Sequence, residues 1–480
     1  MPKAVRPSGT GILPMQEHGL KAAVSSHVSP SVRKIGMVSL GCAKNLVDAE
    51  IMLGGACEEG FEITADPAEA DILVVNTCGF IDSAKQESVD AILESHRGLR
   101  PGQKLVVSGC LSQRFSKELA RDLPEVDAFI GLDQVSGAGK IFRGLLGAGG
   151  GVLNLVTPKP RYIPDYATPR FRLTPRHTTY VKIAEGCNHP CSFCVIPQMR
   201  GRHRSRTLES ILREIRQLVA DGVKEINLIS QDTTYFGMDL WEQKAGPRQP
   251  ADPARGTTLI QLLDAIAEIP GDFWIRLLYT HPAHWSDELI AAIARNPKAA
   301  RYVDIPLQHI HPDMLKAMRR ETSRGHIENL IARLRAGIPG LGLRTTFIVG
   351  FPGETAEHFD ALLEFIASSR FERLGVFNYS QEDGSRAAKM DGQVSPRVKN
   401  RRHREAMQLQ QKIARETAAA MSGRTVRILV EQPNIGRTEH DAPEVDCRAV
   451  LTEPCEPGTF VNAKVIGSQV YDLVAHPEKD

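Results

Sequence analysis

The chain has 480 residues, a formal net charge of +2 and 24% charged residues. This length suggests two to four domains with ample material for buried cores. So small a net charge does not by itself indicate a polyanionic partner. Since no apolar run reaches the roughly 18 to 20 residues of a membrane-spanning helix, we expect a soluble, cytoplasmic protein without a membrane partner.

The N-terminal residues and the cysteine count indicate whether the protein is secreted and whether its thiols are reduced. Residues 1–33 are rich in Gly, Pro and Ser and lack the apolar stretch of a secretory signal, which predicts a flexible extension. The nine cysteines are an odd number in a large chain without such a signal. This argues against a disulfide framework and for reduced thiols, some of which could bind metal or take part in catalysis.

Apolar strands alternate with amphipathic helices in residues 34–145, which predicts an open parallel sheet with crossover helices. The predicted strands are 35–40, 70–77, 105–108 and 128–131, and helices are expected at 45–59 and 83–96. A glycine-rich run and a proline-rich stretch follow, so we expect a linker at 146–172.

A second alternating series fills residues 173–410 and predicts a (β/α) partial barrel of about six units. Its expected strands are 180–184, 225–230, 274–279, 302–306, 343–349 and 374–379. A long polar helix is predicted at 397–421, and short strands with Pro and Gly turns follow it. Residues 413–480 should therefore form a small all-β barrel, which makes the chain an α/β protein of three parts.

Three cysteines stand within eight residues in EGCNHPCSFC: Cys187, Cys191 and Cys194. Their spacing lets three thiolates point inward from one loop, which suits soft metals and iron–sulfur clusters. A structural zinc site would need four ligands, yet no second pair stands at a suitable distance, and His189 would have to fold back between two ligands. A four-iron cluster on three thiolates would instead keep one iron open for a substrate or cofactor.

This pattern, after a predicted barrel strand, resembles the radical S-adenosylmethionine superfamily. The resemblance implies that Cys187, Cys191 and Cys194 hold a [4Fe-4S] cluster whose open iron is chelated by S-adenosylmethionine. It further implies one-electron cleavage of the sulfonium to a 5′-deoxyadenosyl radical. The loop follows the carboxyl end of a strand, where barrel active sites lie.

A second set of three cysteines is dispersed in sequence: Cys42, Cys78 and Cys110. Each falls just after a predicted strand of the first sheet. Since the carboxyl ends of parallel strands share one edge, we expect these three to converge and bind metal. The alternative is that each is a small buried apolar residue. The remaining cysteines, Cys57, Cys447 and Cys455, are assigned no chemistry.

Two three-cysteine sites in one chain resemble the methylthiotransferase family, in the family's order of N-terminal cluster domain, radical core and TRAM barrel. The resemblance covers the chain from residue 34 and implies a second [4Fe-4S] cluster on Cys42, Cys78 and Cys110. It also implies two uses of S-adenosylmethionine, sulfide as the sulfur source and a low-potential electron donor. The segments that carry it are SLGCAKNLVDAE, EGCNHPCSFCVIPQMRG, ISQDTTYFG, DIPLQH, FIVGFPGET and DAPEVD.

These segments are similar to the branch that adds a methylthio group to the β-carbon of an aspartate in a small-subunit ribosomal protein, protein twelve. Residues 423–480 hold six Lys or Arg and ten Asp or Glu, a net charge of −4, which is poorly suited to tRNA. Two alternatives stay open: a tRNA adenosine methylthiotransferase, and a non-catalytic iron–sulfur or zinc protein.

Other polar residues are left without a firm role. Four arginines beside the cysteine loop could bind phosphate, orient the S-adenosylmethionine carboxylate or the substrate's aspartate, or simply be solvated: Arg200, Arg202, Arg204 and Arg206. The residues at predicted strand ends could position S-adenosylmethionine or make structural hydrogen bonds: Gln231, Asp232, Gln308 and His309. Three histidines in proline-punctuated turns are expected to be neither ligands nor bases: His281, His284 and His311.

Overall fold

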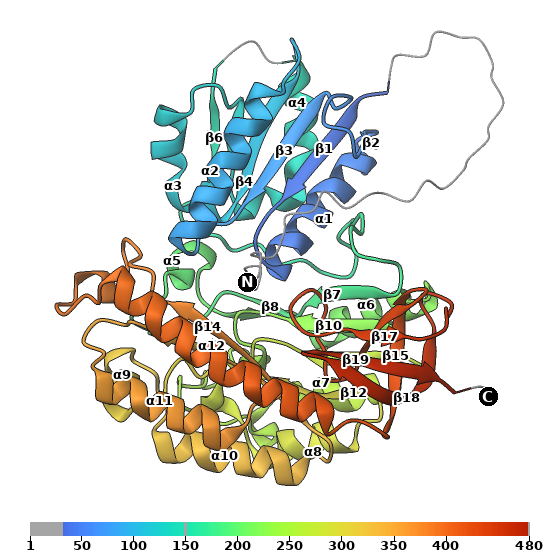
Figure 1. Cartoon of the computed structure of the whole chain (residues 1–480). Helices are drawn as coiled ribbons and strands as arrows, with labels where there is room; N and C mark the ends of the chain where they lie inside the picture. Colours follow the sequence, from blue (N-terminus) through green and yellow to red (C-terminus); the bar gives the residue numbers. More distant parts are fainter. Residues whose placement is uncertain (1–31, 148–150, 479–480) are drawn as a thin grey trace. The chain divides into compact units, whose positions relative to one another are not determined.

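The computed structural model describes residues 32–147 and 151–478 and divides into two compact units (Figure 1). The first unit comprises the described residues up to Leu173 together with Gln198–Gly201, and the second comprises Thr174–Pro197 and the residues from Arg202 onward. Residues 1–31, nearly all of the predicted extension, lie outside the described residues.

The first unit is built on a six-stranded sheet in which every neighbouring pair is parallel, in the order β2-β1-β3-β4-β5-β6. Its strands are β1 Lys34–Ser39, β2 Glu62–Ile63, β3 Ile72–Thr77, β4 Lys104–Gly109, β5 Ala128–Ile130 and β6 Leu153–Leu155. All six residues of β3 are buried, as expected for a central strand covered on both faces. Strands β1, β3 and β4 lie side by side, so the chain segments that follow them meet at one edge.

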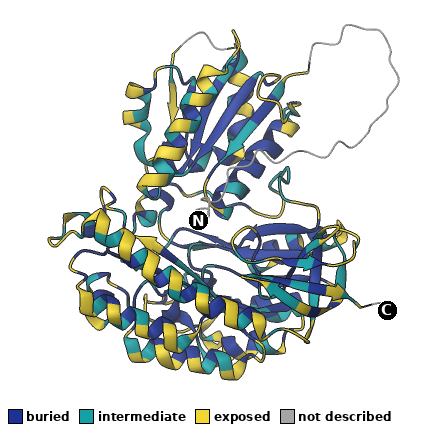
Figure 2. Cartoon of the chain, viewed as in Figure 1, coloured by how far each residue is buried: buried dark blue, intermediate teal, exposed yellow. Residues whose placement is uncertain are grey.

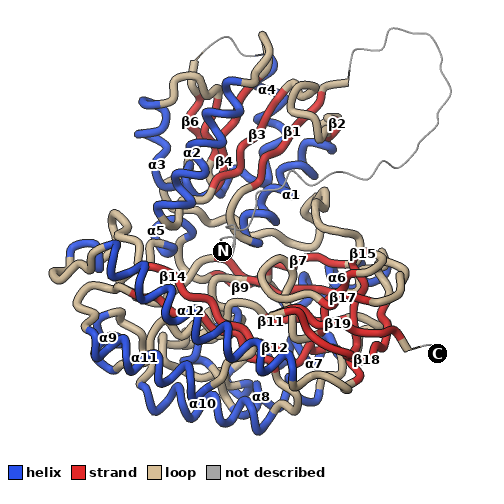
Figure 3. Tube along the Cα trace, viewed as in Figure 1, coloured by secondary structure: helices blue, strands red, loops and turns tan. Residues whose placement is uncertain are grey.

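Helices connect these strands, as Figure 3 shows. They are α1 Ala43–Glu58, α2 Asp82–Arg97, α3 Cys110–Asp122, the short 3-10 helix η1 Leu132–Gly137 and α4 Ala138–Gly147. The sheet packs around Val75, Val107 and Phe129, each with an exposed fraction of 0%. Helix α1 is buried over most of its length, which fits its apolar and small residues.

The second unit contains another six-stranded parallel sheet, in the order β14-β13-β12-β11-β10-β7. Its strands are β7 Thr178–Lys182, β10 Glu225–Ile229, β11 Trp274–Leu277, β12 Ala299–Asp304, β13 Gly342–Val349 and β14 Arg373–Asn378. A separate two-stranded antiparallel pair, β8 Ala184–Glu185 and β9 Arg204–Ser205, frames the cysteine loop.

Amphipathic helices cover this second sheet. They are α6 Leu208–Ala220, α7 Leu259–Ala267, α8 Asp287–Arg295, α9 Pro312–Ala317, α10 Arg324–Gly337 and α11 Ala356–Ser369. The short helix α5 Ile196–Arg200 follows the cysteine loop, and its residues from Gln198 onward belong to the first unit. Several begin at a side-chain cap, for example Thr207 on α6 and Ser286 on α8. Figure 2 shows both sheets largely buried, with helices that alternate buried and exposed positions, the pattern of an amphipathic cover.

The long helix α12 Pro396–Ala419 leads into a closed five-stranded barrel in the second unit. Its strands are β15 Thr425–Gln432, β16 Ile435–Thr438, β17 Ala449–Leu451, β18 Phe460–Gln469 and β19 Asp472–Pro477. The barrel interior is filled by small and branched side chains such as Val430, Ala463 and Ala475. Full closure removes exposed strand edges from this small module.

Buried ion pairs attach the barrel to the second sheet. Glu225 has an exposed fraction of 0%, accepts a hydrogen bond from Arg276 Nε at 2.7 Å and pairs with Arg437 of β16. Burial acts to raise the pKa of Glu225, but the charges of Arg437 and Arg276 outweigh it and lower the pKa to about 2. The carboxylate therefore stays ionised, as a buried charge with two cationic partners should.

The DAPEVD segment makes a second set of such attachments. Asp441 pairs with Arg373 at 2.5 Å, and Asp446 accepts from Tyr302 Oη at 2.7 Å and lies 3.3 Å from Arg344. The side chains of both aspartates are almost fully buried. The segment that carried part of the family resemblance therefore serves, at these two positions, to join the barrel to the sheet.

The predicted fold class is confirmed, with two parallel-sheet regions and a closed C-terminal β barrel. Two strands of the first sheet were not expected: β2, which pairs with β1, and β6, which lies inside the predicted linker and pairs with β5. None of the helices in the described part of the chain is long and apolar enough to cross a bilayer. The domain boundaries read from the sequence stay predictions.

Candidate functional site

The loop with Cys187, Cys191 and Cys194 lies between β8 and α5, soon after the carboxyl end of β7. All three residues are partly buried. Arg320 Nη1 lies 3.5 Å from Cys191 Sγ and donates toward it. One of the three sulfurs therefore has a cationic donor directed at it.

The three thiols of the loop influence one another. Burial raises the pKa of Cys187 well above its usual range, and the charges of Asp232, Cys191 and Cys194 raise it further. Burial and Cys191 likewise raise the pKa of Cys194 to about 12. Thiolates that repel one another in a buried loop gain most from a bound cation, so this donor set fits a thiolate-ligated cluster.

Backbone and side-chain hydrogen bonds hold the loop at Ser192. Its N–H donates to the Met318 carbonyl at 3.0 Å, its hydroxyl donates to the Ala317 carbonyl at 2.8 Å, and its own carbonyl accepts from Ala387 N at 2.8 Å. The loop is therefore tied to the end of α9 and to the segment after β14. Its cysteines do not depend on metal alone for their placement.

His189 ties the same loop to two carboxylates. One ring nitrogen lies 2.7 Å from Asp232 Oδ2 and the other 2.7 Å from Glu321 Oε2. Burial lowers the pKa of His189, but these two hydrogen bonds outweigh it and raise the pKa to about 9. As a protonated imidazolium, His189 donates to both carboxylates, since a carboxylate can only accept.

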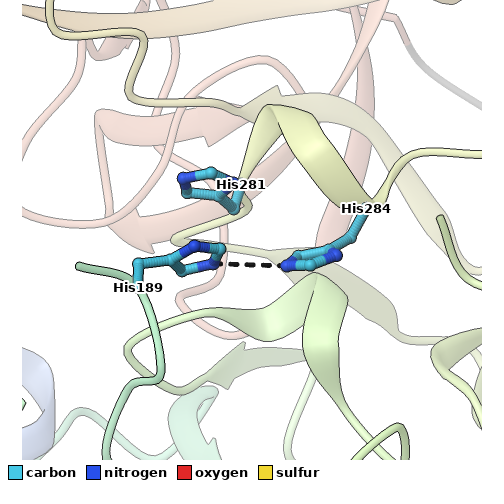
Figure 4. Close-up of side chains that lie close together, drawn as sticks. All are labelled: His189, His281 and His284. Carbon is cyan, nitrogen blue, oxygen red and sulfur yellow. Dashed lines mark hydrogen bonds between the residues drawn. The ribbon is translucent and has the colours of Figure 1, made fainter. Parts of the chain in front are cut away.

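Two more histidines complete a buried group around His189 (Figure 4). The His281 ring stacks on His189 with 3.6 Å between ring centroids, and His284 Nε2 lies 3.2 Å from His189 Nε2. His281 and His284 come from the short 3-10 helix η4 Pro282–His284 and the residue before it. From the sequence, His281 and His284 are expected to be neither ligands nor bases because they belong to proline-punctuated turns, so their approach to His189 is not predicted.

The dispersed cysteines converge in the first unit. Cys42 follows β1, Cys78 follows β3 and Cys110 is the first residue of α3, directly after β4. A Cβ on Gly41 would lie 2.9 Å from Cys78 Cβ, and one on Gly79 would lie 2.9 Å from the carbonyl carbon of Cys110. Glycine at both positions allows three cysteine-bearing segments to approach one another.

Polar contacts fix these segments. Asn45 Nδ2 donates to the carbonyls of Leu40 at 2.6 Å and Thr77 at 3.2 Å, while Asn76 Nδ2 donates to the Asn45 carbonyl at 2.7 Å. The Ser88 hydroxyl accepts from Cys78 N at 2.9 Å. Because the backbone at the ends of β1 and β3 is paired in this way, Cys42 and Cys78 are presented in a defined arrangement.

The dispersed thiols also differ in their electrostatics. Burial, followed by the charges of Cys110 and Cys42, raises the pKa of Cys78 to about 12. The pKa of Cys42 is lowered instead: desolvation acts to raise it, and the charges of Lys44 and Arg200 outweigh that effect. Cys42 is also the exposed member of the three.

Arg200 lies in the first unit, although it follows the cysteine loop in sequence. Its Nη2 donates to Asp48 Oδ2 at 3.0 Å and lies 3.3 Å from Cys110 Sγ. Arg206 is buried and pairs with Glu214 at 2.5 Å, while Arg204 Nη1 donates to the Arg202 carbonyl at 2.7 Å. These arginines therefore make separate contacts, and two of them are buried, so they do not form one exposed phosphate patch.

The remaining strand-end residues have structural partners. Gln231 Nε2 donates to Glu185 Oε1 at 2.9 Å, and His309 Nδ1 accepts from His311 N at 3.0 Å. In the GFPGET turn, Glu354 Oε2 accepts from Phe351 N at 3.1 Å and also from Gly350 N. Arg320 and Glu321 were not singled out from the sequence, because an isolated Arg or Glu carries no spacing signal.

The chain matches three known families in succession. These are the Uncharacterized protein family UPF0004 over residues 34–131, the Radical SAM superfamily over 181–366 and the TRAM domain over 423–477. The solved structure of the radical S-adenosylmethionine methyltransferase TsrM from Kitasatospora setae, with tryptophan substrate and a SAM analogue bound, is similar in fold. Its TM-score is 0.52 at 16% identity, over 72% of this chain and 73% of TsrM.

Curated relatives extend over nearly the whole chain. A protein of Opitutus terrae named ribosomal protein uS12 methylthiotransferase RimO is 57% identical over 454 residues, which cover 92% of this chain and 96% of the relative. A protein of the same name from Akkermansia muciniphila is 51% identical over 447 residues, with 92% and 99% covered. One from Pelobacter propionicus is 44% identical, with 93% and 98% covered.

Proposed function

Because the chain belongs to the RimO family of ribosomal protein uS12 methylthiotransferases and carries a Radical SAM superfamily domain, we propose that it adds a methylthio group to the β-carbon of an aspartate in uS12. It is a transferase of the radical SAM class. The aspartate and its β-carbon come from the resemblance in sequence, and the protein substrate comes from the name that the relatives share.

In this proposal Cys187, Cys191 and Cys194 hold the [4Fe-4S] cluster that binds S-adenosylmethionine. The second [4Fe-4S] cluster is held by the dispersed set, Cys42, Cys78 and Cys110. The observation that carries the assignment is that the nine cysteines include two separate groups of three thiols, each close enough to shift the pKa values of its own members. Each group has three thiol donors, which leaves one place on a four-iron cluster for another ligand.

When bound, the clusters with S-adenosylmethionine and sulfide supply the one-electron cleavage and the sulfur transfer that an unactivated C–H bond requires. The chain's own residues hold the cysteine-bearing segments in position. Arg320 and Arg200 each place a cation beside one cysteine of a triad, at 3.5 Å from Cys191 and 3.3 Å from Cys110. Ser192 and His189 fix the loop, and Asn45 and Asn76 fix the sheet edge.

Charge supports a protein substrate over tRNA. The C-terminal barrel region carries a net charge of −4 over residues 423–480. Two of its acidic residues, Asp441 and Asp446, are buried in ion pairs, so they do not contribute to the charge presented to solvent. Of the six Lys or Arg in this region, Arg437 is buried and paired with Glu225, so little positive charge is left for phosphate recognition. An external low-potential donor and a location in the cytoplasm, with the ribosome, are part of the proposal.

The test is to reconstitute the protein anaerobically and incubate it with S-adenosylmethionine, sulfide and dithionite. One sample contains ribosomal protein uS12 and the other contains total tRNA. Mass spectrometry should find a methylthio group on an aspartate of uS12 and no methylthioadenosine in the tRNA. Modification of tRNA alone would overturn the proposal, and zinc in place of iron would favour a non-catalytic protein.

A further inference from the structure

The buried group around His189 has the form of a metal site separate from both cysteine triads. We propose that His189 Nε2, His284 Nε2 and Asp232 Oδ2 bind one divalent transition-metal ion of the zinc class. This site goes beyond the proposed methylthiotransfer, which uses none of these atoms as metal ligands. It would fasten the cysteine loop to the ends of β10 and β11.

The three atoms face one point. His189 Nε2 lies 2.7 Å from Asp232 Oδ2, His284 Nε2 lies 3.3 Å from the same oxygen, and the two Nε2 atoms are 3.2 Å apart. Ligand atoms around a tetrahedral zinc ion with bonds near 2 Å are about 3.3 Å from one another. Two of the three separations match that value, and the third is the hydrogen bond that metal binding would replace.

In each proposed ligand, the ring nitrogen or carboxylate oxygen that does not face the site makes a hydrogen bond that orients the side chain. His189 Nδ1 donates to Glu321 Oε2 at 2.7 Å, and His284 Nδ1 donates to the Gln249 carbonyl at 2.6 Å. Asp232 Oδ1 accepts from Thr234 Oγ1 at 2.7 Å, which leaves Oδ2 for the site. Metal-binding histidines typically use the far ring nitrogen in this way, since it fixes the tautomer and the ring direction.

Burial and charge fit a cation. His189, His284 and Asp232 have exposed fractions of 6%, 0% and 2%, and Glu321 Oε1 is a buried carboxylate oxygen without a hydrogen-bond partner among the described residues. Two buried carboxylates therefore meet three imidazoles, a balance that one divalent ion would neutralise. Imidazole with carboxylate is a donor set that zinc accepts readily.

His281 closes the site without serving as a ligand. Its Nδ1 accepts from Ala283 N at 3.3 Å, so the proton is on Nε2, which is buried, makes no hydrogen bond among the described residues and lies 3.9 Å from Glu321 Oε2. That nitrogen lies beside the same Glu321 oxygen that accepts from His189 Nδ1. The stacking of His281 on His189 excludes bulk solvent from one side.

The experiment uses the full-length, iron-reconstituted protein with one equivalent of Zn²⁺, followed by desalting and elemental analysis. We expect about one zinc in addition to about eight iron per chain. X-ray absorption spectra at the zinc edge should show nitrogen and oxygen neighbours at about 2.0 Å. His284→Gln leaves the hydrogen bonds of His189 to Asp232 and Glu321 in place, so it should lower zinc retention at least tenfold with the iron content unchanged. Asp232→Asn, made independently, should lower zinc retention by a similar factor. His358→Gln, in the separate His311, Asp313 and His358 group, is the matched control.

Several results would overturn the site. No zinc retained by the unaltered protein would mean that the group is a hydrogen-bond network only. Sulfur neighbours near 2.3 Å would place the zinc on cysteines instead. Zinc retained in full by both His284→Gln and Asp232→Asn would exclude these ligands. Iron content and cleavage of S-adenosylmethionine are measured in parallel, so failure of the metal site is distinguishable from failure of the proposed function.

Discussion

The two cysteine triads each bring three thiols together, but one does so by local spacing and the other by sheet topology. The loop triad, Cys187, Cys191 and Cys194, lies within eight residues and depends on local spacing. The dispersed triad spans 69 positions from Cys42 to Cys110 and depends on the topology β1-β3-β4. A site made by spacing can be disturbed at its own loop, whereas a site made by topology is exposed to any change that separates neighbouring strand ends.

Their supporting contacts differ in the same sense. The loop triad is held by side chains from outside the loop, such as Glu321 and Asp232 on His189. The dispersed triad is held by backbone closeness at glycines and by asparagines that bind strand-end carbonyls. We therefore expect the dispersed triad to be the more sensitive of the two to a Cβ added at its glycines.

The largest effects should come from removing one cysteine of each triad. Cys191→Ala should lower the iron content from about eight to about four per chain and abolish cleavage of S-adenosylmethionine. Cys110→Ala should lose the same amount of iron but retain that cleavage, while forming no methylthiolated uS12. Iron analysis and measurement of 5′-deoxyadenosine check both. Equal loss of cleavage in the two variants would contradict independent triads, and Cys455→Ala is the matched control.

An alanine in place of a glycine at the sheet edge should distinguish the two triads nearly as clearly. Gly79→Ala would place a Cβ 2.8 Å from Leu111 N and 2.9 Å from the Cys110 carbonyl, so the strand ends must move apart. We expect loss of about four iron per chain with the radical-site cluster intact. Gly144→Ala, where a Cβ meets nothing within 4 Å, is the control. Full iron in Gly79→Ala would show that the sheet edge tolerates the shift.

The two thiol-facing arginines should have smaller and separable effects. Arg200→Met and Arg320→Met each remove a positive charge beside one triad, so each should lower the reduction potential of its own cluster only. Arg200→Met should also lower the free energy of unfolding by about 3 kcal/mol, because buried Asp48 loses an ionic partner. Redox titration followed by electron paramagnetic resonance and urea unfolding check these effects.

The exposed Arg202→Met serves as the control for both substitutions. It should change neither potential. If Arg200→Met moved the potential of the radical-site cluster, the separation of the two triads would be wrong.

The smallest effect concerns thiol reactivity in metal-free protein. Because the pKa of Cys42 is lowered, its thiolate forms at lower pH and its alkylation rate should level off below the usual thiol pKa of about 8.5. Cys78 and Cys194, each with a pKa of about 12, should react slowly at pH 8. Iodoacetamide labelling mapped by mass spectrometry checks this order. Cys57 is the reference thiol: the residue is exposed, and partial desolvation of its thiol raises its pKa. Labelling of Cys78 faster than Cys42 would contradict the predicted order.

Much of the fold could be predicted because parallel strands such as ILVVNT at β3 are continuous apolar runs bounded by turn residues. The convergence of Cys42, Cys78 and Cys110 also followed from topology alone. Strand β6 was missed because its residues, LNL, are short, exposed and set among glycine and proline. A short edge strand has little pattern to detect.

The group around His189 could not be predicted for another reason. His189, Asp232, His284 and Glu321 come from four separate segments, and no fixed spacing relates them. The sequence predicts a turn at His284, and the structure has the short helix η4 there. This helix also directs the His284 ring toward His189. Side-chain direction at strand ends depends on tertiary packing, which a single sequence does not state.

The buried pairing of Glu225 with Arg437 has a consequence during synthesis. The two residues lie 212 positions apart, so the carboxylate on β10 leaves the ribosome long before its second cation does. The first unit, apart from residues 198–201, has its whole sequence by Leu173. At typical synthesis rates of about 5 to 20 residues per second, the nascent second unit would wait some ten seconds or more with this carboxylate only partly neutralised.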